Sequence, residues 1–291
     1  MLETFAIPAL EAIDAALAAR ACESLEQGAV LLFPELAFPL EPAERRMIAQ
    51  GQTTGAAKNI SLDPRTGKLK GVEPSENDNH LAALMTRFGV FAESLIRAIA
   101  PHYGPGLARM RTSFRPTEIA GRDYSWRKDD RRRHVDAFPS SPTQGARILR
   151  VFANIDQDGA PRLWRVGPDF ESYARNFLPK ISARQFPGVP ALMALLGITK
   201  SRRSLYDQIM LELHDAAKRD LAWQATTPAE DISFAPGNIW VTFTDQTPHS
   251  VISGHNALEQ TFIVDPKVLQ RPEHAPAAIL SRLRGADCLR N

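Results

Sequence analysis

The sequence predicts an α+β protein whose core is an antiparallel jelly-roll flanked by helices. Strand-like segments cluster in residues 107–166 and again in 231–264, and helical patterns lie before and between these clusters. Strands and helices therefore do not alternate along the chain as they do in a doubly wound parallel sheet. Two distant groups of short strands that must pack together are typical of a jelly-roll.

The first hundred residues carry the clearest helical patterns. Apolar residues at helical spacing predict helices over 9–27 and 78–100, and Pro101 ends the second helix. Residues 28–33 form a short apolar run that predicts a strand. Residues 51–76 are rich in turn-forming residues, and we expect a surface loop or hairpin there.

The first strand cluster contains three predicted strands, over 107–119, 146–155 and 161–166. Arginines recur on one face of the first of these strands. Such a row is either a solvated surface or the wall of an anion-binding pocket, and the pattern alone favours the solvated surface.

Residues 168–222 are expected to form a helical insertion, in which Ser204-x-x-Asp207 has the pattern of a helix-capping box. Short strands separated by turns follow between 231 and 264. The predicted organisation is one domain, with a helical N-terminal part over 1–105, a strand core over 106–266 and a partly helical tail over 267–291.

Composition excludes several classes of protein. Hydrophobic residues make up 44% of the chain and charged residues 23%, as in ordinary globular domains, and a net charge of +2 gives no indication of a nucleic-acid partner. The N-terminus lacks the pattern of a signal peptide, and no apolar run reaches the roughly 18 residues of a membrane span. The two cysteines, Cys22 and Cys288, lie near opposite ends, which fits a reducing compartment. We therefore expect a cytoplasmic protein.

The strongest functional signal is the motif His134-x-Asp136 together with the distant His249. Residues two apart on a strand point to the same face, so His134 and Asp136 can bind one ion together. His249, in a second strand-like segment, can supply a third ligand. Two imidazoles and one carboxylate hold one face of Fe(II) and leave positions open for a co-substrate and O2. The sequence therefore predicts a non-haem iron site.

Basic residues near this motif are candidates for binding acidic ligands. Arg147 and Arg150 lie on the next predicted strand, and a guanidinium can pair with a carboxylate through two parallel hydrogen bonds. Because they are three residues apart, at most one of them points into the site on an ideal strand. The charged loop over 122–133 is either solvated or a rim that attracts an acidic substrate. His214 has no partner at ligand spacing and is expected to be structural or partly exposed.

Longer stretches of sequence narrow this interpretation. The His134-x-Asp136 and His249 motif resembles the facial triad of the Fe(II)/2-oxoglutarate-dependent oxygenases. The chain also resembles the 3-deoxy-D-manno-oct-2-ulosonic acid (Kdo) hydroxylases of Gram-negative bacteria, most clearly from about 107 to 265. Four segments carry that resemblance: Arg147–Ile155, Pro161–Glu171, Ser204–Asp215 and Pro248–Gly254.

The resemblance implies a double-stranded β-helix that binds Fe(II) through His134, Asp136 and His249. It implies an enzyme that uses O2, oxidises 2-oxoglutarate to succinate and CO2, and hydroxylates C3 of Kdo in lipopolysaccharide, with ascorbate as a stimulating additive. Its substrate is Kdo-containing lipid A, so peripheral contact with the cytoplasmic face of the inner membrane is expected. No oligomeric state is indicated. Kdo carries a carboxylate and lies beside phosphorylated glucosamine, so Arg115, Arg127 and Arg131 are expected to bind substrate anions.

The sequence departs from the wider oxygenase pattern at one place. Many relatives have an arginine or lysine about ten residues after the distal histidine, and this base holds the co-substrate. Here residues 257–262 read Ala-Leu-Glu-Gln-Thr-Phe, without a basic residue. Arg147 and Arg150 are therefore the candidates for binding 2-oxoglutarate, with Gln260 as a neutral donor.

Three alternatives stay open at this point. The triad does not distinguish Kdo from another small molecule or a protein side chain as substrate. A non-catalytic jelly-roll that binds metal or sugar would lack both an O2 position and a 2-oxoglutarate clamp. Finally, His134 and His249 could be ordinary histidines that never meet, although the strand context of both favours a shared site.

Overall fold

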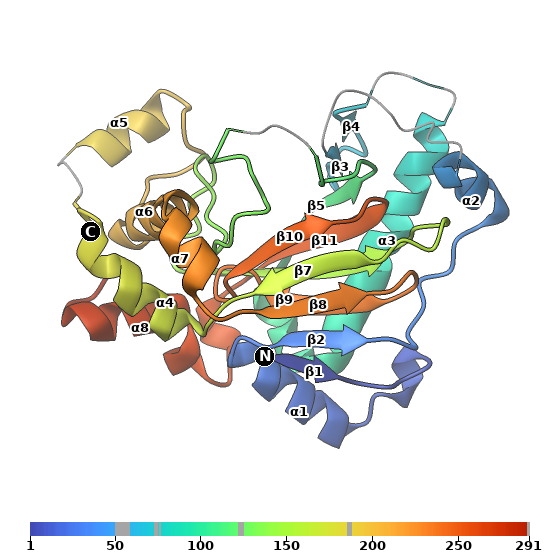
Figure 1. The fold of residues 1–291 in the computed structure, drawn as a ribbon, viewed down its shortest axis with the longest axis horizontal. Coiled ribbons are helices and arrows are strands. Elements are labelled where there is room, and N and C mark those ends of the chain that lie inside the picture. The colour runs from blue at the N-terminus through green and yellow to red at the C-terminus, as the bar shows by residue number, and fades with distance from the viewer. Residues whose placement is uncertain (50–58, 73–74, 76, 122–124, 185–187, 290–291) are drawn as a thin grey trace.

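A computed structural model describes residues 1–49, 59–72, 75, 77–121, 125–184 and 188–289. These residues form two sheets, one large and one small, with helices on the outer face of the large sheet and at one end of both sheets (Figure 1). The strands of the large sheet, in spatial order, are β1 (Leu2–Thr4), β2 (Val30–Phe33), β9 (Ile239–Phe243), β6 (Arg147–Asn154), β11 (Ala257–Val264), β5 (Leu107–Arg115), β3 (Ile60–Leu62) and β4 (Leu69–Lys70). The small sheet consists of β10 (His249–Ser253), β7 (Arg162–Val166) and β8 (Glu230–Phe234). Only the β1–β2 pair is parallel among the described strands.

The helices form two groups. The outer face of the large sheet is covered by α1 (Ala15–Glu26) and α3 (Asp78–Ile99), with α2 (Pro42–Ala49) beside α3. A second group lies at one end of the sheets: α4 (Phe170–Phe177), α6 (Leu205–Arg219), α7 (Leu221–Thr226) and α8 (Pro276–Arg284), with α5 (Val189–Leu195) farther out (Figure 1). Short 3-10 helices are η1 (Leu10–Ala12), η2 (Pro101–Gly106), η3 (Leu178–Lys180), η4 (Pro266–Val268) and η5 (Pro272–His274).

The alternation of side chains along β6 shows how the core is divided. Leu149 and Val151 point to the outer face of the large sheet and join the core beneath α1 and α3. Arg150 and Phe152 point to the inner face, toward the small sheet. A strand that is apolar on one face and mixed on the other thus separates a helix-covered core from a chamber between the sheets.

Aromatic side chains fill much of the space between the two sheets. Trp240 of the large sheet stacks on Phe234 of the small sheet at 4.1 Å between ring centroids, and on Phe152 at 5.2 Å. Trp164 of the small sheet meets Phe152 edge-on at 4.9 Å. These large buried rings fix the separation of the sheets, and a polar cavity adjoins them.

The predicted strands of both clusters and the helix over 78–100 are confirmed. The N-terminal part over 1–105 is not only helical, because it also adds β1–β4 to the large sheet. Within 51–76, β3 and β4 form a hairpin, while residues 51–58, 73–74 and 76 lie outside the described residues. In the described part of the chain, no helix combines the length and the apolar character needed to cross a bilayer.

Arg133 fixes the loop that leads to His134. Its side chain is 1% exposed, lies over the Trp223 ring at 4.6 Å, and donates hydrogen bonds to carbonyl oxygens at the end of α7. The unpaired carbonyls at a helix C-terminus carry partial negative charge, so a buried cation is favourable there. The segment before the motif is thereby held against the helical insertion.

We predict that Arg133→Met lowers the free energy of unfolding by about 2–4 kcal/mol, because the carbonyls of α7 lose a buried charged donor. Denaturant unfolding measures this change. The control is Arg131→Met, which removes a more exposed guanidinium that pairs with Asp129 and should cost less than about 1 kcal/mol. Equal costs for the two variants would contradict the role given to Arg133.

Candidate metal and co-substrate site

His134 and His249 lie directly opposite each other in an isolated antiparallel bridge. The amide of His134 donates to the carbonyl of His249 at 3.0 Å, and the reverse hydrogen bond is 2.9 Å. Two residues on, the amide of Asp136 donates to the carbonyl of Thr244 at 2.8 Å. One potential ligand atom from each of His134, Asp136 and His249 lies within 4.8 Å of the others. The alternative in which the two histidines never meet is therefore wrong.

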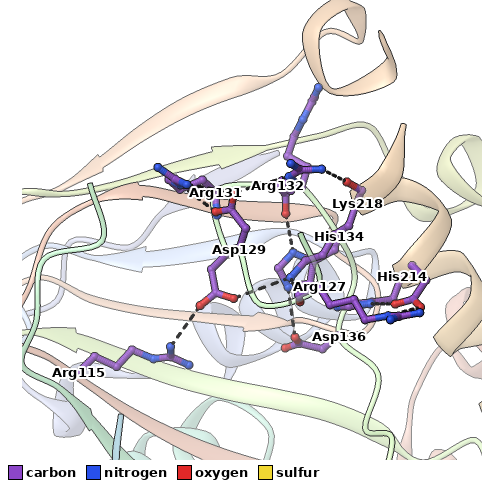
Figure 2. A network of polar contacts seen from close by, with 12 residues as sticks. Arg115, Arg127, Asp129, Arg131, Arg132, His134, Asp136, His214 and Lys218 are labelled. Carbon is purple, nitrogen blue, oxygen red and sulfur yellow. Dashed lines mark hydrogen bonds and ion pairs between the residues drawn. The ribbon is translucent and has the colours of Figure 1, made fainter. Parts of the chain in front are cut away.

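The backbone also fixes the orientation of both imidazole rings. Nδ1 of His134 lies 2.7 Å from the carbonyl oxygen of Arg132, and Nδ1 of His249 lies 2.8 Å from that of Thr247. Each ring therefore carries its proton on Nδ1 and presents the Nε2 lone pair. Figure 2 shows His134 between Arg132 and Asp136. A histidine that donates its second ring nitrogen to a carbonyl is typical of metal ligands.

Electrostatics keep the three side chains in the protonation states that a metal needs. Burial, with Lys218 nearby, holds the pKa of His134 well below its ordinary value, and burial also lowers the pKa of His249. Burial alone would raise the pKa of Asp136, but the Arg150 guanidinium, the two imidazoles and a hydrogen bond from Thr244 together outweigh it and hold that pKa low. Neutral imidazoles and an ionised carboxylate are the forms that bind a divalent cation, so these residues fit Fe(II).

The two oxygens of Asp136 have different partners. Oδ1 lies 3.8 Å from Nε2 of His134, whereas Oδ2 lies 3.2 Å from a terminal nitrogen of Arg150. The other terminal nitrogen of Arg150 lies 3.1 Å from Glu259. Arg150 thus orients the carboxylate and leaves one of its oxygens for a metal.

A polar cavity extends from the three ligands between the sheets. Arg115 pairs with Glu259 through two hydrogen bonds of 2.6 and 2.9 Å. The charged residues that line the cavity are three arginines and three carboxylates: Arg115, Arg150, Arg162, Asp130, Asp136 and Glu259. Their formal charges cancel, so a bound divalent metal would leave the cavity with a charge of +2.

Arg162 is the member of this group that lacks a carboxylate partner among the described residues. It is 2% exposed, and its side chain donates a hydrogen bond to the neutral carbonyl of Gly254 at 3.2 Å. Burial, together with neighbouring Arg115, lowers its pKa to about 9, which leaves it charged at neutral pH. A buried cation without an anion is costly, so the cavity fits an anionic ligand.

Trp164 supplies a second donor to the same cavity. Its indole stacks on the His249 ring at 5.0 Å between centroids. Neither its Nε1–H nor the Nε–H of Arg162 meets a hydrogen-bond acceptor within the described part of the chain, although both are buried. Both residues line the cavity beside the metal ligands.

Two residues expected to bind 2-oxoglutarate lie elsewhere. Arg147 is fully buried, pairs with Asp245 at 2.8 Å and donates to Gln246 at 2.6 Å, away from the cavity. Gln260 points to the outer face of the large sheet, where it bonds Thr112 beneath α3. The expectation that these two side chains face the cavity is corrected. Side chains alternate between the two faces of β6 and β11, and both of these lie away from the inner face.

The three arginines expected to bind the substrate lie in different parts of the structure. Arg115 lies in the cavity wall. Arg127 is exposed over the Trp126 ring and pairs with Asp215 at 3.0 Å, and Arg131 pairs with Asp129 at 2.8 Å. The row of arginines on β5 is interrupted by a bulge opposite β11. The bulge brings Arg109 to the outer face beside Gly89.

His214 is partly exposed, as expected, and it also contacts the metal ligand His134. Its ring packs edge-on against His134, with 5.0 Å between centroids, and Nδ1 lies 3.1 Å from Asp215 (Figure 2). The sequence gives no signal for this contact, because α6 and the motif are far apart along the chain. Arg162 and Trp164 were missed as site residues, although their spacing of two placed them on one face of β7.

The protonation states of the triad lead to a prediction for the metal-free protein. His134 and His249 have lowered pKa values in the folded state, so the unfolded chain takes up protons first as the pH falls below about 6.5. Stability should therefore fall by about 1 kcal/mol or more between pH 7 and pH 5. Urea unfolding in the presence of a metal chelator, at each pH, measures this loss of stability. A His134→Gln/His249→Gln variant should lose less over this interval, whereas exposed His80→Gln should behave as the parent.

Comparisons with known proteins agree with this geometry. A family model described as 3-deoxy-D-manno-oct-2-ulosonic acid (Kdo) hydroxylase matches residues 10–287. Solved structures of the Kdo hydroxylase KdoO, a non-haem Fe(II) α-ketoglutarate-dependent dioxygenase, are 44% identical over 99% of this chain and 97% of theirs. Their TM-scores are 0.92 for complexes with α-ketoglutarate and Fe(III) or with succinate and Fe(III), and 0.93 for the cobalt(II) complex. The search of curated proteins gave no match.

The match covers the metal motif, the cavity and the helical insertion alike, and the identity is high over nearly the whole length of both proteins. The chain therefore belongs to the Kdo hydroxylase family.

Proposed function

We propose that the protein is an Fe(II)/2-oxoglutarate-dependent dioxygenase that hydroxylates C3 of Kdo in Kdo-containing lipid A. His134, Asp136 and His249 hold Fe(II) in this proposal. The observation that carries it is the triad of His134, Asp136 and His249 beside Arg162, a buried cation that has no carboxylate within ion-pair distance among the described residues. The family and its KdoO structures support the choice of metal, co-substrate and Kdo.

The charge of the cavity fits 2-oxoglutarate. The described charged residues of the wall cancel, Fe(II) adds two positive charges, and 2-oxoglutarate adds two negative ones. The distal carboxylate of the co-substrate accepts from Arg162, with Arg115 beside it, and the Trp164 N–H is a further donor. Arg150 remains with Asp136 and Glu259. A guanidinium in a dry cavity binds a carboxylate strongly because both desolvated charges are paired.

The protein contributes mainly orientation and exclusion of water. Bound Fe(II) supplies the activation of O2 and the oxidation of 2-oxoglutarate to succinate and CO2. The backbone carbonyls at Arg132 and Thr247 keep the two imidazoles turned toward the metal. Arg150 keeps the Asp136 carboxylate ionised, and Trp164 shields the His249 face of the cavity. Fixed ligands and a pre-formed anion site avoid reorganisation during the reaction.

The rim of the site is proposed to receive the charged substrate. A groove of about 600 Å³ lies between α6 and the loop after the metal motif. Its wall includes Arg127, Lys180, Arg203 and Arg219. We propose that Arg127 and Arg131 bind the anionic groups of the lipid-linked sugar, with Arg115 deeper in the cavity. Arg133 has no part in this, because it is buried against α7.

We also propose that the fold is a double-stranded β-helix and that the protein is cytoplasmic. The two facing antiparallel sheets support a double-stranded β-helix, with the whole chain as one catalytic domain. A lipid-linked substrate requires a cytoplasmic protein to reach the inner membrane peripherally. Ascorbate is expected to stimulate turnover, as it does for oxygenases that need their iron kept ferrous.

Arg162→Gln should raise the KM for 2-oxoglutarate by about 30-fold or more, because the co-substrate loses its buried cation. Succinate formation measured against 2-oxoglutarate concentration gives this value. Arg165→Gln is the matched control, since Arg165 is on the same strand but exposed and paired with Asp231. A KM unchanged by Arg162→Gln would place the carboxylate elsewhere.

The reaction itself is tested by the mass of the lipid product. After incubation with Fe(II), ascorbate and 2-oxoglutarate, Kdo-containing lipid A should gain one oxygen. His134→Ala or Asp136→Ala should abolish the gain, since two remaining ligands do not hold the metal, whereas His255→Ala outside the cavity should retain it. Succinate formation without oxygen in the lipid would leave the oxygenase chemistry intact and refute the Kdo substrate.

A further inference from the structure

Helix α5 and the turn after it expose an unusual set of apolar side chains. Leu195 is 84% exposed and Leu196 is 63% exposed, and α5 lies at the outer edge of the molecule in Figure 1. The large exposed apolar residues of this segment are Val189, Leu192, Leu195, Leu196 and Ile198. These five residues lie within ten positions, and a concentration of exposed apolar side chains of this kind, called the patch below, marks an interaction surface.

The patch has the spacing of a single helix face. Val189 and Leu192 are three residues apart on α5, and Leu196 follows four residues later at its C-cap, so the three lie along one side of the segment. Pro190 is buried on the opposite side. The helix therefore already uses one face against the protein and presents a second apolar face outward.

The charges within the segment that carries the patch are of one sign, although Glu212 of α6 lies beside Val189 and Pro190 in a neighbouring pocket. No acidic residue occurs between 172 and 206, whereas six basic residues do, although the whole chain has a net charge of only +2. Those that bracket the patch most closely are Arg184, Lys200, Arg202 and Arg203, and Lys200 and Arg202 are exposed. An apolar helix face flanked by cations matches the two layers of an anionic lipid surface, acyl chains beneath and phosphates above.

This segment is connected to the metal site. The amide of Lys200 donates to the carbonyl of Ser140 at 2.9 Å, and Arg203 donates to that of Pro139 at 2.8 Å, in the loop directly after the metal motif. Residue 203 then leads into α6, which lines the groove and carries His214 beside His134. A surface held by α5 would thus have a defined position relative to the catalytic cavity.

We propose that residues 188–202 are a docking surface for a bilayer that contains anionic lipids. The outer face of α5 enters the interfacial layer, and Lys200 and Arg202 contact lipid phosphates. The inference deepens the proposed function, because it assumes that the Kdo substrate is attached to a lipid. It explains how a chain without a recognisable spanning helix in its described part reaches such a substrate.

The test is sedimentation of the full chain with vesicles of phosphatidylglycerol and phosphatidylcholine. The triple variant Leu192→Ser/Leu195→Ser/Leu196→Ser should bind the mixed vesicles at least about tenfold more weakly, because three apolar side chains no longer enter the interface. The control is Val90→Ser/Leu221→Ser, which removes exposed apolar side chains of 54% and 61% exposure elsewhere and should bind as the parent.

The charged part of the surface is tested separately. Lys200→Glu/Arg202→Glu should weaken binding to mixed vesicles by about tenfold, and added salt should weaken binding of the parent. Binding by the parent that does not depend on phosphatidylglycerol would overturn the role of the cations. Vesicle binding that is unchanged in the triple serine variant would overturn the docking surface. It would also be overturned if the parent forms a dimer and the triple serine variant is a monomer.

Succinate formation from 2-oxoglutarate without vesicles should be the same in the parent and in the α5 variants, which shows that the site is intact. Failure of the two proposals can then be distinguished. If α5-dependent vesicle binding occurs but the lipid gains no oxygen, the Kdo substrate is refuted and the docking surface stands. If the lipid gains oxygen but vesicle binding does not depend on α5, the docking surface is refuted and the Kdo substrate stands.

Discussion

The site depends on the paired backbone hydrogen bonds between His134 and His249. These bonds join a loop to the first residue of β10, although 114 positions separate the two histidines in the chain. Each histidine then turns its Nδ1 to a carbonyl two residues before it, so both present Nε2. Asp136 follows at the distance of one strand alternation, tied by its amide to Thr244. The backbone pairing therefore determines the ligand geometry before any metal binds, and a metal gains affinity from ligands that need little reorganisation.

The cavity beside the ligands is unusual because its charges are almost all paired, with one exception. Glu259 is held ionised by Arg115 and Arg150, which outweigh its burial and lower its pKa. Arg150 in turn holds Asp136. Arg162 has only a neutral carbonyl among its described hydrogen-bond partners, and this arrangement is costly until an anion arrives. With a divalent metal bound, the cavity would carry two positive charges, and a dianionic co-substrate would balance them and give Arg162 a direct partner.

The helical insertion contacts the loop that carries the metal motif. Arg133 binds the end of α7, Arg132 donates to the carbonyl of Lys218, and His214 packs on His134. The loop that carries the metal motif is thus held between a strand and α6. Because α6 continues from the segment that includes α5, one helical unit contacts the metal ligands and exposes the apolar patch. Short hydrogen bonds from Lys200 and Arg203 therefore connect the segment that carries the patch to the loop after the metal motif.

The sequence by itself determined the strand clusters, the long helix over 78–100 and the three candidate ligands, because each depends on local periodicity or on residue types with few other uses. It also indicated that Arg147 and Arg150 face opposite sides. Only the tertiary structure decided which one faces the cavity, since the two faces of a fully buried strand look alike in sequence. It also decided that Arg162 and Trp164 belong to the site and that Arg133 does not. Each of these roles depends on a partner distant in the chain. The local sequence of an arginine does not show whether its side chain binds a carboxylate, a helix C-terminus or a ligand.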